Sequence, residues 1–145
     1  MGQVDFAQAF VEREPICTQE ELDAWTAELV PIIEEITGWK YREPPVVRAA
    51  TRAMLVDSIE KDILNSPGNN STGSGSARIV AALHSAMVLG VYGRTTNEAY
   101  VAVTNFGPLM DHLGLDAARG KDLARLVLAH ELTHVLQDHL VDLEE

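Results

Sequence analysis

The sequence predicts an α+β fold, mostly helical, with a small antiparallel sheet beside one central helix. Apolar residues recur at helical spacing over several long stretches, which is typical of amphipathic helices. Two short β-rich runs at 88–92 and 100–104 flank a polar turn, and this arrangement is typical of a hairpin. With 145 residues, of which 46% are hydrophobic, the chain is expected to form a single domain, 1–145.

The N-terminal residues 1–65 are expected to be helical. A short helix is expected over 3–13. Thr18-Gln19-Glu20-Glu21 matches a capping box, so a longer helix should follow it and end near Gly38. Pro31 lies inside this pattern and should kink or split the helix.

The segment Val46–Ala50 is compatible with either a short strand or the start of a helix that ends near Asn65. A Gly/Ser/Asn-rich run at 66–76 predicts a flexible loop. The remaining part, 77–145, should contain a further helix, the hairpin, a connection at 106–121 with a short helical turn at 109–113, and a final helix.

The final helix should begin between Asp116 and Lys121 and run to about Asp142, and it carries His130-Glu131-Leu132-Thr133-His134. Histidines four residues apart lie on one face of a helix, so both imidazoles can bind one metal ion. The carboxylate of Glu131, next to the first histidine, can act as a general base. HExxH on a helix is therefore a candidate zinc site.

Apolar residues follow two opposite faces of this helix, so it is expected to be central, with both faces buried. One face carries Leu128, Leu132, Val135, Leu136 and Leu143, and the other carries Leu123, Val127, His130, His134, Gln137 and Val141. Buried histidines need polar partners, and a metal ion would supply one.

The run Ala129 to Asp138, AHELTHVLQD, resembles the active-site helix of zincin metallopeptidases, in particular gluzincin-like proteins. The resemblance covers about residues 88–142. It implies a zincin-like fold, Zn²⁺ as cofactor, His130 and His134 as zinc ligands, and Glu131 as the catalytic base. It also implies hydrolysis of peptide bonds by zinc-activated water, with an edge strand within 88–104 that binds an extended peptide or protein substrate. Tyr92, Tyr100 and His112 are possible donors to the oxyanion, although each is more simply structural.

The third zinc ligand departs from both zincin patterns. A gluzincin glutamate would lie some twenty or more residues beyond His134, whereas only eleven residues follow it here. The metzincin pattern fails as well, because Gln137 replaces its glycine and Leu140 stands where a histidine is needed. His139 should point away from His130, given the step of about 100° per residue. Three further carboxylates remain. Asp138 is better placed as a hydrogen-bond partner near the site, and the terminal Glu144 and Glu145 would have to fold back.

Three explanations stay open: a fragment of a peptidase, a ligand from elsewhere in the chain or from another subunit, or an inactive zincin-like fold. The leading function is thus a zinc-dependent metallopeptidase or part of one. The alternative is a catalytically inactive zincin-like binding or scaffold module. A third, weaker interpretation is a helical interaction domain in which HExxH occurs by chance.

Composition indicates which classes of partner and which cellular compartment to expect. The net charge of −11, with only 11 Lys and Arg, argues against nucleic-acid or membrane partners. The single cysteine, Cys17, permits no intrachain disulfide and is expected to be structural. No signal-peptide pattern is present at the N-terminus, so a cytoplasmic location is expected.

Overall fold

The computed structural model describes residues 11–66 and 74–141. Most of the helix expected over 3–13 lies outside them, and residues 11–13 are not helical. The elements follow the order α2 (Gln19–Thr37), β1 (Val46–Ala49), α3 (Arg52–Leu64), α4 (Ser74–Ser85), β2 (Gly90–Gly93), β3 (Glu98–Val101), α5 (Phe106–Leu113) and α6 (Ala117–Val141). The α+β class predicted from the sequence is confirmed.

The three strands form one mixed sheet in the order β1-β3-β2. The hairpin prediction is confirmed, because β2 pairs antiparallel with β3, with Tyr92 opposite Ala99. The expectation of a purely antiparallel sheet is wrong, because β1 pairs parallel with β3. A parallel pair needs a long crossover connection, and here α3, α4 and β2 provide it.

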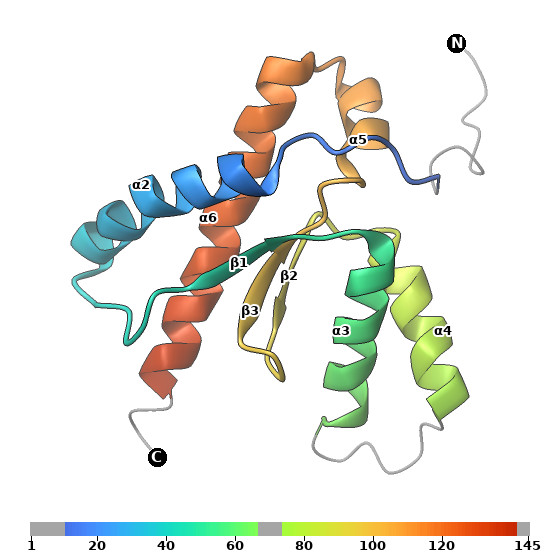
Figure 1. Ribbon diagram of the computed structural model, residues 1–145, viewed down its shortest axis with the longest axis horizontal. Coiled ribbons are helices and arrows are strands. Elements are labelled where there is room, and N and C mark those ends of the chain that lie inside the picture. Colours follow the sequence, from blue (N-terminus) through green and yellow to red (C-terminus); the bar gives the residue numbers. More distant parts are fainter. Residues whose placement is uncertain (1–10, 67–73, 142–145) are drawn as a thin grey trace.

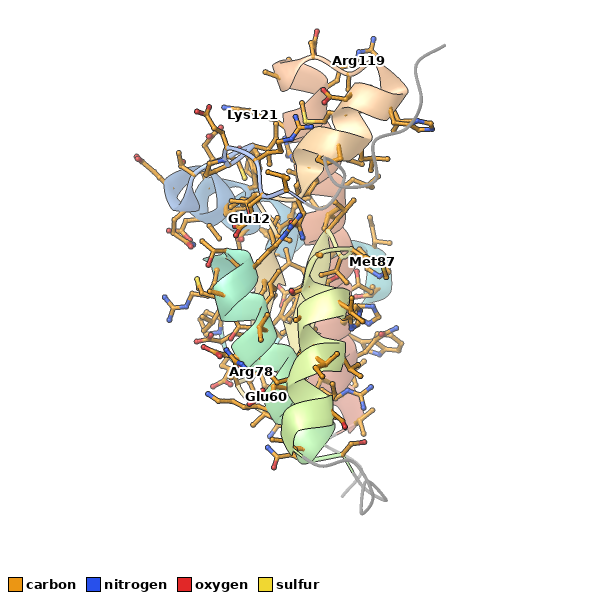
Figure 2. All side chains as sticks on the ribbon, turned by 90° about the vertical axis from the view of Figure 1, so that its right-hand side faces the viewer. Glu12, Glu60, Arg78, Met87, Arg119 and Lys121 are labelled. Atoms are coloured by element: carbon orange, nitrogen blue, oxygen red, sulfur yellow. The ribbon has the colours of Figure 1, made fainter. Side chains whose placement is uncertain are left out.

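Helices cover both faces of this sheet (Figure 1), with α2 and α6 on one side and α3 and α4 on the other. The alternation of side chains along β3 explains this arrangement. Ala99 and Val101 belong to the core cluster shared with α2 and α6, whereas Tyr100 belongs to the cluster shared with α3 and α4. Figure 2 shows the outer side of α3 and α4, where Arg78 and Glu60 pair across the two helices at 3.3 Å.

The predicted signals at the ends of α2 are present. Thr18 and Glu21 form the capping box, and Gly38 closes the helix with a left-handed backbone (φ 77°). Pro31 lies inside α2, and the helix continues through it without being split.

Two segment predictions need adjustment, and a choice left open by a third is decided. Ser74–Ser76 begin α4 instead of belonging to the flexible loop, and residues 67–73 lie outside the described residues. The helical turn expected at 109–113 is the end of an eight-residue helix, α5. The segment 46–50, which was open between strand and helix, is a strand as far as Ala49. Within the described part of the chain, no helix is both long enough and apolar enough to cross a membrane.

Candidate metal and catalytic site

The two motif histidines converge on one point beside α6. Their Nε2 atoms lie 3.0 Å apart, and their rings are nearly perpendicular, with centroids separated by 4.6 Å. Two imidazole nitrogens bound to one tetrahedral zinc ion, at about 2.0–2.1 Å each, would lie roughly 3.3 Å apart. The pair therefore needs only a small movement to hold one metal ion.

The face of α6 that carries these histidines is exposed, so the expectation that both faces are buried is wrong. Only the face with Ala124, Leu128, Leu132, Val135 and Leu136 is fully buried, against α2 and the sheet. No described element covers the opposite face fully, so His130, His134 and Gln137 reach solvent there. Exposure leaves the imidazoles of His130 and His134 accessible to a ligand from solvent. Leu143, which was expected on the buried face, lies outside the described residues.

Glu131, by contrast, is only 5% exposed. Burial raises the pKa of its carboxyl group above the ordinary value, while the neighbouring His134 and His130 act in the opposite direction. A raised pKa makes the carboxylate a better proton acceptor.

Gly90, in β2, makes room for the Glu131 side chain. A Cβ atom at position 90 would lie 2.9 Å from both Cγ and Oε1 of Glu131, and 2.8 Å from Cγ1 of Val127. Any larger residue at this position would displace the carboxylate. Sequence reasoning did not identify Gly90, because nothing in the local pattern shows that β2 passes so close to α6.

Two cavities are lined by both His130 and Glu131. One, of about 710 Å³, is lined by His130 and Glu131 together with Val88, Leu89, Leu126 and Val127. The other, of about 360 Å³, is lined by all three motif residues and by His84, Tyr92 and Arg94. The first cavity has apolar walls with a few convergent polar groups, as ligand sites typically do, whereas the second is lined mainly by polar side chains. The second cavity brings in His84 and Arg94, which sequence reasoning had not assigned to the site, since α4 and the hairpin turn meet there only in the folded chain.

Strand β2 borders the site as an edge strand. Its inner edge is paired with β3, and it is the last strand on that side of the sheet. An edge strand presents backbone N–H and C=O groups that can pair with an extended peptide. The edge strand beside the HExxH helix is therefore β2, not β3.

Gln137 and Asp138, which follow His134 on α6, contact different residues. Oε1 of Gln137 lies 3.2 Å from Nδ1 of His134, so it can accept the proton on Nδ1. Nε2 of His134 then carries no proton, and it can accept a hydrogen bond from Nε2 of His130, as their 3.0 Å separation allows, or bind a metal ion. The Tyr92 hydroxyl donates to Asp138 at 2.6 Å. Asp138 thus holds a strand residue, and Gln137 is the side chain that orients the histidine.

The remaining aromatic and histidine candidates lie in other surroundings. His139 is buried on the opposite side of α6, where its ring meets that of Tyr41 edge-on, which agrees with the predicted direction. The Tyr100 hydroxyl is hydrogen-bonded to Glu98, on the α3 side of the sheet. His112 is an exposed residue of α5.

Among the described residues, no group of three or more His, Cys, Asp or Glu side chains is arranged to hold a metal ion. The described residues thus offer two candidate zinc ligands, His130 and His134, and do not supply a third. Glu144 and Glu145 lie outside the described residues.

No family model matches the sequence, and neither a curated protein nor a solved structure matches it significantly.

Proposed function

We propose that the protein is a zinc-dependent metallopeptidase, or the part of one that carries the HExxH helix, with His130 and His134 as metal ligands. The observation that carries this proposal is the 3.0 Å approach of the two Nε2 atoms next to the buried carboxyl group of Glu131. Zinc held in such a site activates water and polarises a carbonyl group.

Glu131 is the base in this proposal. Its carboxylate would take a proton from the attacking water and pass it to the leaving amine of the peptide. Gly90 keeps the space that this carboxylate occupies, and strand β2 would hold the peptide by strand addition. The large cavity next to His130 and Glu131 would receive an apolar side chain of the substrate.

A catalytically inactive zincin-like binding module is the second candidate, and one observation favours it. Catalytic zinc sites use three protein ligands and one open position, whereas the described residues provide two. Such a module would bind peptides along β2 without cutting them.

The test combines metal content and peptide cleavage in four proteins: wild type, Glu131→Gln, His134→Ala and the control His112→Ala. We expect about one zinc per chain in wild type, Glu131→Gln and His112→Ala, and loss of zinc in His134→Ala. Cleavage of a mixed peptide library should be seen only in wild type and His112→Ala. Zinc binding without cleavage by wild type would support the inactive module, and absence of zinc from wild type would contradict both candidates.

A further inference from the structure

Arg94 is the first residue after β2, and its side chain lines the cavity that also contains His130, Glu131 and His134. It also lines a neighbouring cavity of about 240 Å³ with His134 and Gln137. A cationic side chain thus stands at the far end of the edge strand, within the candidate site.

The backbone around Arg94 is held in place by α3. The carboxylate of Asp62 accepts hydrogen bonds from the backbone N–H groups of Arg94 (3.2 Å) and Thr95 (3.0 Å). Asp62 therefore fixes the turn through the main chain, and the exposed guanidinium group extends from an anchored position.

The guanidinium group of Arg94 has no ion pair or hydrogen bond with any described residue. Four other arginines pair with carboxylates within the chain: Arg13, Arg48, Arg78 and Arg125. Asp138, which shares the smaller cavity with Arg94, is engaged by the Tyr92 hydroxyl. In a chain with a net charge of −11, an arginine without a carboxylate partner beside the candidate site is a specific feature.

Arg94 and the apolar cavity beside His130 and Glu131 lie at opposite ends of strand β2. Gly90 lies against Val127 and Glu131 at one end, and Arg94 follows the other end. Four residues of extended chain span about 13 Å, so an extended peptide along β2 would reach both features with residues about two to four positions apart.

We propose that Arg94 determines substrate specificity by binding a carboxylate of the peptide, while the apolar cavity takes a side chain two to four residues away. This proposal rests on the proposed peptide binding at the same site. The carboxylate is either an Asp or Glu side chain or the free C-terminus of the peptide. Guanidinium groups bind carboxylates through paired, charge-assisted hydrogen bonds, which neutral amides do not match.

The probes are alanine-based peptides with one leucine and one glutamate, placed two, three or four residues before or after the leucine. Each peptide has a glutamine counterpart and is made with either an amidated or a free C-terminus. Binding is measured by calorimetry on zinc-loaded Glu131→Gln protein, so that the result does not depend on cleavage, and kcat/KM is measured on the active chain. Failure of cleavage alone then counts against the proposed activity and not against the role of Arg94.

In the protein with Arg94 intact, we expect at least one carboxylate position to improve binding by about tenfold or more over its neutral counterpart. Arg94→Gln should abolish this preference, and Arg94→Glu should reverse it, so that the glutamate peptide binds more weakly than its glutamine counterpart. A preference for the free C-terminus over the amide identifies the terminal carboxylate, and a preference for glutamate over glutamine identifies the side chain.

Arg119→Gln is the matched control. Arg119 is also exposed, and its guanidinium group has no ion pair or hydrogen bond with a described residue, although its backbone N–H donates to Asp116. It lies near the N-terminal end of α6 (Figure 2), about 17 Å along the helix from His130. Its substitution should leave the preference unchanged. Equal binding of charged and neutral peptides, no binding of any peptide, or a carboxylate preference that survives Arg94→Gln would overturn the proposal.

Discussion

Substitution of Gly90 by alanine tests whether Glu131 acts as a base from the position that the structure gives it. The added Cβ would lie 2.8–2.9 Å from Val127 and Glu131, whereas ordinary contacts begin near 3.4 Å. The Glu131 side chain must therefore move by about half an ångström or more, because Val127 blocks the other direction. Misplacement of a catalytic group by about 1 Å can reduce the rate some 10²-fold.

We expect Gly90→Ala to lower kcat/KM by about 10- to 100-fold while zinc content stays the same, since the three atoms nearest to the added Cβ belong to Val127 and Glu131 and not to His130 or His134. Overpacking should also lower the free energy of unfolding by about 1–3 kcal/mol. Gly120→Ala is a matched control, because its Cβ would also overlap neighbours, here Met110 and Ile16, but far from the motif. The reasoning is refuted if Gly90→Ala retains wild-type kcat/KM, or if Gly120→Ala loses as much activity.

Three further predictions concern stability and the role of Tyr92. Asn105→Ala should lower the free energy of unfolding by about 2–4 kcal/mol in urea denaturation, because its buried amide binds Arg52, Ser85 and Val88, and an effect below 1 kcal/mol would contradict this. Burial raises the pKa of the Cys17 thiol from 9.0 to about 11. The neutral thiol is therefore favoured in the folded state, and the free energy of unfolding should fall by about 2 kcal/mol as the pH rises from below 9 to 11. The fall should be smaller in Cys17→Ala, and equal pH profiles of the two proteins would rule out this cause. Tyr92→Phe should lower the free energy of unfolding by about 1–2 kcal/mol, because the lost hydroxyl donates a hydrogen bond to Asp138. It should change kcat by less than tenfold, and a larger loss of kcat would identify Tyr92 as a catalytic donor.

The sequence predicted correctly those structural features that depend on residues close together in the chain. The capping box at Thr18, the stop at Gly38 and the hairpin between β2 and β3 depend on neighbouring residues, and each is present. The parallel pairing of β1 with β3 joins residues about fifty positions apart, and no local pattern specifies such a pair.

In the candidate site, too, the features set by neighbouring residues were predictable from the sequence, and those set by tertiary packing were not. Helical spacing alone predicts that His130 and His134 lie together and that His139 points elsewhere. The roles of Gly90 and Arg94 depend on how β2 lies against α6, which only tertiary packing determines. Burial of the histidine face was predicted from its apolar residues, but Leu126 and Val141 on that side are 67% and 60% exposed.

The coordination sphere of zinc in the loaded protein is the most direct test of the central claim. X-ray absorption at the zinc edge of wild type should show two imidazole ligands with Zn–N distances of about 2.0–2.1 Å. His134→Ala should lose at least one of them, while His112→Ala should give the wild-type spectrum. Zinc bound without imidazole ligands, or a spectrum unchanged by His134→Ala, would contradict the assignment of His130 and His134 as the metal ligands.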